Sequence, residues 1–232
     1  MKRPRMILFD YGQTLMDEAD FDGLKGTAAV MAYAVTNRDG KTAEEVQAFA
    51  ESMSRDLRPL CQVEVSNLAF QKYLYESLGI TFSLTPSEVE QVFWDHAGPA
   101  VLTPHIRELL EHLAAGKIRT GVFSNMSFSG ATLADRICRF LPDHRFEFIL
   151  ASSEYIFRKP HRRVFDLLLS QAGLSPEDVW YCGDNVIWDI EGASQCGIFP
   201  VWYRGALKRR EETPACRHLA IDDWSELLDL LK

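Results

Sequence analysis

The sequence predicts an α/β protein, with a doubly wound parallel sheet as its core and a small α-helical domain inserted after the first strand. Two observations predict this fold. Short apolar runs alternate with segments of helical periodicity over the second half of the 232-residue chain, as in parallel sheets with helices on both faces. A long stretch of helical pattern also separates the first apolar run from the second. The predicted core is residues 1–18 and 98–232, and the predicted insert is residues 19–97.

Five short runs, rich in apolar and β-branched residues, are the predicted strands of the core. They are Met6–Phe9, Thr120–Ser124, Phe146–Leu150, Val179–Cys182 and Phe199–Trp202. The segments between them carry helix start and stop signals. In TPHIRELLEHLAAG, for example, Thr103 is expected to cap the helix and Gly116 to end it. These signals support an order in which strands and helices alternate.

The insert is expected to contain helices only, because no strand pattern is convincing between Asp20 and Ala97. Two of its helices begin with the spacing of a capping box, Thr42 with Glu45 and Thr85 with Glu88. A small bundle placed after the first strand would lie over the carboxyl edge of the sheet, where open α/β folds bind ligands. A role as a lid over that edge is therefore expected.

The composition indicates which kinds of binding partner and which cellular compartment to expect. Hydrophobic residues make up 47% of the chain, which suits a folded core, and the net charge of −8 disfavours a nucleic-acid partner. The basic start is followed by only four apolar residues, too few for a signal-peptide core, and no later run is long enough to span a membrane. Five scattered cysteines without a CxxC pair favour reduced thiols. We therefore expect a cytoplasmic protein without a membrane partner. The sequence makes no prediction of the oligomeric state.

Polar and charged side chains follow four of the predicted strands, at or shortly after the point where each strand ends. They are, in chain order, Asp10, Ser124, Asn125, Lys159, Asp184 and Asp189. Because the carboxyl ends of parallel strands meet along one edge of a sheet, these side chains are expected to converge there. Each alone has a plain explanation as a turn residue or a solvated charge, so the prediction depends on the whole set.

Taken together, the set has the chemistry needed to transfer an anionic group. The negative charge on the oxygens around phosphorus repels a carboxylate nucleophile such as Asp10, and Mg2+ can neutralise that charge. Mg2+ prefers oxygen ligands and usually takes one or two protein carboxylates. The predicted metal ligands are therefore the carboxylates of Asp10 and Asp184 and the main-chain carbonyl of Gly12.

The remaining residues have predicted roles around the phosphate. The hydroxyl of Ser124, the neighbouring Asn125 and Lys159 are expected to bind its oxygens, since hydroxyl, amide and ammonium groups can all donate hydrogen bonds to an anion. Lys159 is also a predicted catalytic residue, because it offers a compact positive charge to the nucleophile and to the transferred group. Asp189 and Asn185 are expected to support this arrangement.

The order of these motifs resembles that of the haloacid dehalogenase superfamily of hydrolases, over essentially the whole chain. FDYGQTL resembles the first motif, GVFSN the second, RKP the third and GDNVIWDIEGA the fourth, which is the most specific. The resemblance implies a Rossmann-like core, Mg2+ as cofactor, an aspartyl-phosphate intermediate on Asp10 and a C1-type helical cap that restricts substrate entry. The expected function is hydrolysis of small phosphorylated metabolites by a Mg2+-dependent phosphatase.

One position departs from the pattern. Phosphatases of this family usually carry a second Asp two residues after the nucleophile, which protonates the leaving group and then activates water; here the residue is Gly12. General acid–base catalysis of this kind contributes roughly 10²–10⁴-fold. The phosphatase interpretation still holds if solvent or a residue of the cap supplies the proton to the leaving group.

Two other interpretations remain open at this stage. A dehalogenase-like or phosphonatase-like hydrolase is one, and a phosphonatase would need a lysine from the insert, where Lys25, Lys41 and Lys72 are the candidates. In dehalogenases the tyrosine of the first motif falls one position later than Tyr11. A catalytically weak protein that binds a phosphate ligand is the other interpretation, because every group needed for binding is present.

Overall fold

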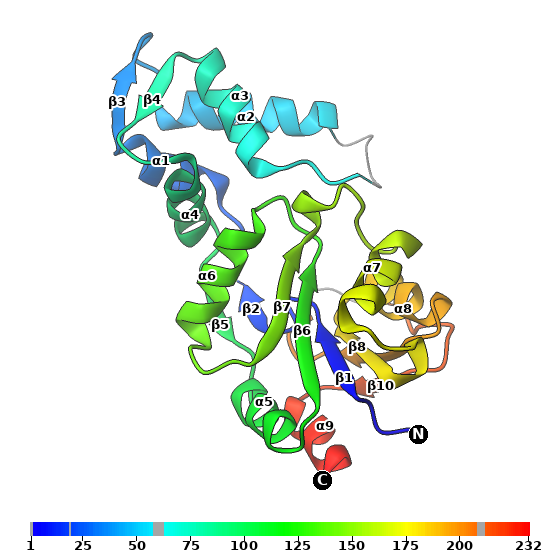
Figure 1. Ribbon diagram of the computed structural model, residues 1–232. Coiled ribbons are helices and arrows are strands. Elements are labelled where there is room, and N and C mark those ends of the chain that lie inside the picture. The colour runs from blue at the N-terminus through cyan, green and yellow to red at the C-terminus, as the bar shows by residue number, and fades with distance from the viewer. Residues whose placement is uncertain (1, 19, 58–62, 208–211) are drawn as a thin grey trace.

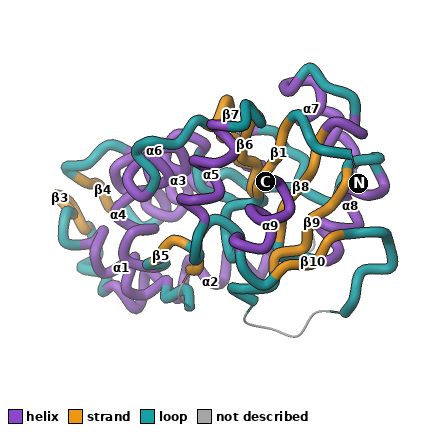
Figure 2. The backbone as a smooth tube through the Cα atoms, turned by 90° about the horizontal axis from the view of Figure 1, so that it is seen from below, coloured by secondary structure: helices purple, strands orange, loops and turns teal. Residues whose placement is uncertain are grey.

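The computed structural model describes residues 2–18, 20–57, 63–207 and 212–232 of the chain. Its core is a six-stranded sheet in the order β10-β9-β8-β1-β6-β7, in which every pair of neighbours is parallel. Figure 2 shows the strands in this order, with the helices of the insert to one side of the sheet. The strands are β1 (Met6–Phe9), β6 (Arg119–Ser124), β7 (Phe146–Ala151), β8 (Val179–Gly183), β9 (Phe199–Tyr203) and β10 (Leu219–Ile221). The predicted α/β fold is confirmed.

All five predicted strands are present, with ends that differ from the prediction by at most one residue. The sixth strand, β10, was not predicted. It has only three residues and lies at the edge of the sheet beside β9. A run this short carries too little alternation to be recognised in the sequence.

Helices cover both faces of the sheet. The central strand β1 shows why its sequence is a continuous apolar run: Ile7 and Phe9 belong to the apolar cluster on one face, and Met6 and Leu8 to the cluster on the other. The first face is covered by α5 (Ile106–Ala115), α6 (Gly130–Phe140) and α9 (Trp224–Leu231), and the second by α7 (Arg162–Ala172) and α8 (Gly192–Gln195) (Figure 1).

The insert has an apolar cluster of its own, to which all four of its helices contribute. The helices are α1 (Gly23–Met31), α2 (Ala43–Leu57), α3 (Asn67–Ser77) and α4 (Pro86–Ala97). The prediction of helices only was wrong, because β3 (Ala34–Asn37) and β4 (Ile80–Phe82) form an antiparallel pair. The residues of β3 follow a helical run closely and were counted as part of it, although Val35 and Thr36 are β-branched and favour an extended backbone.

A second antiparallel pair stands where the chain enters and leaves the insert. Strand β2 (Met16–Glu18) pairs with β5 (Ala100–Leu102), so the two connections run side by side. Hydrogen bonds also join the insert to loops of the core: Asn67 N donates to Ser127 O at 2.8 Å, and Glu64 N to Ile156 O at 2.7 Å. The insert therefore lies over the carboxyl ends of β6 and β7 (Figure 1). The domain limits at 18/19 and 97/98 stay predictions.

Helix ends follow the sequence signals in most places. The capping box of Thr85 and Glu88 is present, and Thr42 and Glu45 exchange the same two hydrogen bonds. The predicted cap at Thr103 was wrong. Its buried hydroxyl donates to the carbonyl of Thr14 at 2.8 Å and accepts from the indole of Trp224 at 2.9 Å, so it ties the connection between core and insert to α9.

Two features of the described residues concern helix length and the state of the cysteines. No helix among the described residues has both the length and the apolar character that crossing a bilayer requires. Four of the five cysteines are free thiols, and the fifth, Cys61, lies outside the described residues.

Replacing Trp224 by Ala is expected to lower the free energy of unfolding by about 3–5 kcal/mol, because large aromatic side chains leave a cavity in a packed core. The Trp224 side chain is completely buried, and its ring stacks on Tyr203 with centroids 4.4 Å apart. Urea denaturation measures the loss. Leu230→Ala, at a half-exposed position of the same helix, is the control and should change stability by no more than about 0.5 kcal/mol. A loss below about 1 kcal/mol for the Trp224 variant would contradict this packing.

Candidate active site

Three carboxylates converge at the carboxyl edge of the sheet. Asp10 directly follows β1, and Asp184 directly follows the neighbouring strand β8. One oxygen of each of these and one of Asp189 all lie within 4.8 Å of one another. Carboxylate oxygens at this spacing are the ligands that a hard divalent cation prefers. The two carboxylates that the sequence predicts as metal ligands are thus close enough to share one ion.

A buried lysine lies at the centre of this group. The Lys159 ammonium donates to Asp10 Oδ1 at 2.7 Å, to Asp189 Oδ1 at 2.5 Å and to the hydroxyl of Tyr181 at 2.8 Å. The lysine is only 2% exposed, and these three contacts equal the number of protons that an ammonium group can donate. Lys159 therefore holds the carboxylate of Asp10 in a defined position.

The charges in this group determine which members hold protons. Burial alone would lower the pKa of Lys159, but the charges of Asp10 and Asp189 outweigh burial and raise that pKa well above its ordinary value. Burial raises the pKa of the Asp189 carboxyl to about 6, against the opposing effect of the Lys159 charge. Lys159 therefore stays a cation at neutral pH and acts through its charge and hydrogen bonds.

Local hydrogen bonds fix the segments that carry these residues. The side-chain amide of Asn125 donates to Lys159 O at 2.9 Å and accepts from Lys159 N at 2.8 Å. Asn125, a predicted phosphate ligand, therefore holds the main chain of Lys159 in place; its contact with a substrate stays a prediction. The side-chain oxygen of Asn185 caps the π-helical segment Val186–Glu191 by accepting from two main-chain N–H groups of that segment. The main-chain N–H of Asn185 donates to Asp189 Oδ2 at 3.0 Å.

Gly183 allows Asp189 to come this close to the strand end. A Cβ atom at position 183 would lie 2.4 Å from the Cβ of Asp189, which no real side chain tolerates. Glycine at the end of β8 is therefore a steric requirement of the site.

A cavity of about 410 Å³ opens onto this cluster. Ser124 lies at the end of β6 and lines it, as every other predicted site residue does. The predicted residues on its wall are Asp10, Gly12, Ser124, Asn125, Lys159, Asp184, Asn185 and Asp189. The residues that the sequence singles out therefore share one cavity, and both the site and the role of each residue stay predictions.

A second cavity of about 700 Å³ adjoins the first, because four residues line both: Phe21, Met126, Phe128 and Trp188. Its remaining wall comes largely from the insert. The surface of the whole cavity is mostly apolar, with Phe70, Leu74 and Phe93 among its members, while Glu51, Glu64 and Arg158 also line it. An anionic group at the carboxylates would thus have an apolar space beside it for the rest of a small molecule.

The three insert lysines that a phosphonatase would require lie elsewhere. Lys25, Lys41 and Lys72 line neither cavity, and they form ion pairs within the insert with Asp22, Glu45 and Glu76 respectively. These contacts give no support to a Schiff base at the cluster.

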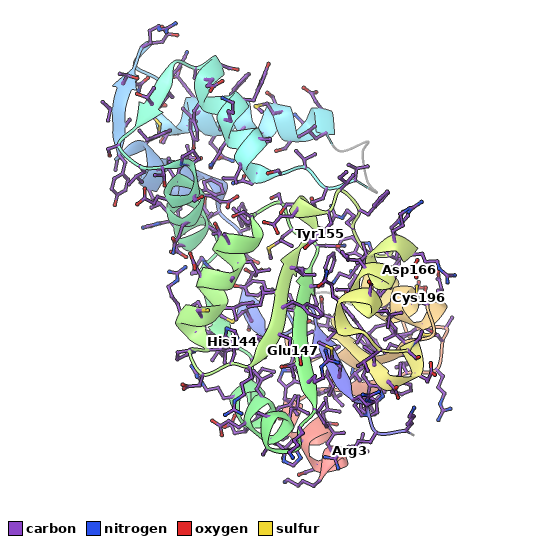
Figure 3. All side chains as sticks on the ribbon, viewed as in Figure 1. Arg3, His144, Glu147, Tyr155, Asp166 and Cys196 are labelled. Atoms are coloured by element: carbon purple, nitrogen blue, oxygen red, sulfur yellow. The ribbon has the colours of Figure 1, made fainter. Side chains whose placement is uncertain are left out.

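Another cavity, of about 570 Å³, lies at the opposite end of β6 and β7. Its wall includes Arg119, His144 and Glu147, and Figure 3 shows the last two far below the insert. None of the predicted site residues lines it. We therefore do not include it in the candidate site.

Sequence reasoning missed two residues of the site. Tyr181 lies in the buried strand β8, and its hydroxyl accepts from Lys159 and donates to Phe123 O at 2.9 Å. A tyrosine in a fully apolar strand must find a partner for its hydroxyl, and this signal could have identified it. Glu18 also lines the cavity of Asp10, but only the pairing of β2 with β5 brings it there, and no sequence pattern predicted that pairing.

A family model described as haloacid dehalogenase-like hydrolase matches residues 4–197 of the chain. The chain belongs to this family. The predicted family membership is thereby confirmed, and with it the identification of the chain as a hydrolase.

Relatives and solved structures agree with this assignment. Phosphoserine phosphatase of Thermus thermophilus is 34% identical over 84 residues, 36% of this chain and 33% of that protein, so the chain spans about a third of its length. Glyceraldehyde 3-phosphate phosphatase of Pyrococcus furiosus is 25% identical over 88% of this chain and 82% of that protein. The crystal structure of 2-haloacid dehalogenase from Pseudomonas syringae shares the fold, with a TM-score of 0.64, 20% identity and 98% of both chains covered.

Replacing Lys159 by Met, with divalent ions removed by EDTA, is expected to lower the free energy of unfolding by about 3–5 kcal/mol at pH 7.5, because two buried carboxylates lose their counter-charge. The loss should be smaller at pH 5. Burial raises the pKa of the Asp189 carboxyl above the unfolded value of about 3.9, and losing the Lys159 charge raises it further, so the folded variant gains a proton and stability as pH falls.

Urea denaturation at the two pH values measures this difference. Lys72→Met removes an exposed lysine that pairs with Glu76 on the same helix and should change stability by no more than about 0.5 kcal/mol. An equal loss at both pH values for the Lys159 variant would mean that the carboxylates do not depend on this cation.

Proposed function

We propose that the protein is a Mg2+-dependent phosphatase of small phosphorylated metabolites, with Asp10 as the nucleophile. The observation that carries this proposal is the gathering of Asp10, Asp184 and Asp189 around Lys159 at one edge of the sheet. Relatives with phosphatase names support the substrate class. A cytoplasmic location is part of the same proposal.

Asp10 is suited to attack phosphorus. Asp10 lines the 410 Å³ cavity, and one oxygen of its carboxylate accepts a hydrogen bond from Lys159. In the proposed reaction, a carboxylate oxygen of Asp10 forms a bond to phosphorus while the bond to the leaving oxygen breaks. Water then attacks the aspartyl phosphate, which releases inorganic phosphate and restores the carboxylate. The positive charge of Lys159 opposes the negative charge that builds up on the phosphoryl group.

The donor set fits Mg2+. The ligands of the ion would be the carboxylates of Asp10 and Asp184 and the main-chain carbonyl of Gly12. The Asp189 carboxylate already accepts hydrogen bonds from Lys159 and from the main-chain N–H of Asn185. When bound, the ion would draw negative charge from the phosphoryl oxygens and so lower the barrier to attack by a carboxylate.

The two adjoining cavities suit a small phosphate ester. The phosphate would lie in the smaller cavity near Ser124 and Lys159, and the organic part would extend into the larger cavity beneath the insert. The mostly apolar wall of that cavity favours a substrate with some apolar or aromatic surface. We propose that the insert acts as the cap that selects the substrate.

Replacing Asp10 by Asn is expected to abolish turnover and phospho-enzyme formation, because an amide is too weak a nucleophile to replace the carboxylate. Hydrolysis of 4-nitrophenyl phosphate and acid-quenched labelling measure the two effects. Asp166→Asn is the control: this residue lies on the outer surface of α7 (Figure 3), so its replacement should leave activity unchanged. An Asp10 variant with normal turnover would contradict the assignment of the nucleophile.

Removing divalent ions with EDTA is expected to stop turnover, and adding Mg2+ should restore it, because the carboxylates alone repel a phosphate anion. A screen of phosphorylated metabolites, including sugar 1-phosphates and phosphonoacetaldehyde, identifies the substrate class. Full activity in EDTA, or turnover of 2-haloacids in place of phosphate esters, would contradict the proposal.

A further inference from the structure

The segment 152–158 leads from β7 to Lys159 and contacts the insert. It begins directly after the strand and ends directly before the lysine. The main-chain N–H of Glu64, between α2 and α3 of the insert, donates to the carbonyl of Ile156 at 2.7 Å. Tyr155, the residue before Ile156, lies just below the insert in Figure 3. The insert therefore supports the backbone that carries Lys159.

Ile156 has a backbone conformation that needs such support. Its φ angle is 66°, in the left-handed region that β-branched residues rarely adopt. The Ile156 side chain is 62% exposed, so packing of that side chain does little to hold the backbone. Two contacts with the insert support it instead: the hydrogen bond from Glu64, and an isolated antiparallel bridge between Phe157 and Val63. The conformation of the segment thus depends on the insert.

The side chain of Glu64 adds a second connection to the same segment. This side chain is only 8% exposed, and its Oε2 accepts from the hydroxyl of Ser152 at 2.7 Å and lies 3.5 Å from the guanidinium of Arg158. Ser152 is the first residue of the segment and Arg158 the last. Burying a carboxylate is costly unless it is paired and hydrogen-bonded, so Glu64 favours the arrangement in which both partners stay within reach. One carboxylate of the insert thus holds both ends of the segment.

Both partners of this carboxylate are connected to Lys159. Arg158 precedes the lysine in the chain. The hydroxyl oxygen of Ser152 accepts from the main-chain N–H of Met126 at 2.9 Å. Met126 follows Asn125, whose side-chain amide bonds to both the N–H and the carbonyl of Lys159. Loss of the carboxylate would therefore disturb the main chain of Lys159 by two routes.

We propose that Glu64 is a positioning residue, which acts through Ser152 and Arg158 to hold the main chain of Lys159 in place. The inference rests on the proposed phosphatase function, in which Lys159 holds Asp10 as the nucleophile. Glu64 does not line the cavity of Asp10, so it acts on the reaction through other residues. Because Glu64 belongs to the insert, Lys159 is held in this way only while the insert lies over the edge of the sheet.

Kinetics of Glu64→Ala separate this role from direct contact with a substrate, since Glu64 also lines the larger cavity. A misplaced Lys159 weakens catalysis whatever the leaving group. We expect kcat to fall roughly 10-fold or more for both acetyl phosphate and 4-nitrophenyl phosphate, with KM changed by less than about 3-fold. The acetyl group is small and should not contact Glu64. A loss confined to 4-nitrophenyl phosphate, or a rise in KM at unchanged kcat, would overturn the proposal.

Two further variants control for the loss of a carboxylate from the insert. Glu76→Gln changes an exposed residue of α3 that pairs with Lys72 on the same helix, so both kcat values should stay unchanged. Glu64→Gln keeps an oxygen that can accept from Ser152, and it should recover at least about 3-fold of the kcat lost in Glu64→Ala. No recovery in Glu64→Gln would contradict a role through this hydrogen bond.

Hydrogen exchange tests the structural link without relying on activity. In Glu64→Ala, the main-chain N–H groups of Met126 and Lys159 should exchange at least about 10-fold faster than in the wild type, because their acceptors are no longer held in place. The N–H groups of β1 should be unchanged, which shows that the core is folded, and Glu76→Gln should match the wild type throughout. Mass spectrometry of peptides that cover these positions measures the rates.

Faster exchange confined to the insert of Glu64→Ala would overturn the proposal, because the change would not reach Lys159. These rates also separate this inference from the proposed function. If Asp10→Asn kept normal turnover, the assignment of the nucleophile would fail, and the exchange rates would still decide whether Glu64 holds the main chain of Lys159.

Discussion

The site depends on one buried cation. The Lys159 ammonium lies within 2.8 Å of oxygens of Asp10, Asp189 and Tyr181, where almost no solvent reaches it. Without this charge, three carboxylates within 4.8 Å of one another would face one another with no cation between them, and they would repel. Lys159 therefore balances the charge of Asp10 and holds its carboxylate in place.

The rest of the fold brings these residues together. Parallel pairing of β1 with β8 places the residues that follow them, Asp10 and Asp184, side by side. Gly183 lets Asp189 approach the strand end, and Asn125 fixes the main chain of Lys159. The insert then adds a mostly apolar cavity over this polar floor. The charged side chains thus lie at the edge of the sheet, and the larger cavity that the insert lines lies beside them.

Long-range pairing explains which parts of the site the sequence could predict. Apolar runs ending in polar residues revealed the strands, and parallel pairing then implied that Asp10, Lys159 and Asp184 converge. The place of Glu18 on the cavity wall could not be predicted, because β2 and β5 have three residues each and lie on opposite sides of the insert in the chain. The strand β3 was missed because it follows a helical run closely and was counted as part of it, and β4 because three residues are too few to show alternation.

A crystal structure with Mg2+ and beryllium trifluoride, a mimic of a carboxyl-bound phosphoryl group, tests the central claim most directly. The account predicts that beryllium is bonded to a carboxylate oxygen of Asp10, that the metal ion is shared by Asp10, Asp184 and the carbonyl of Gly12, and that Lys159 contacts a fluoride. A metal ion that does not contact both carboxylates, or beryllium bonded to another residue, would contradict it.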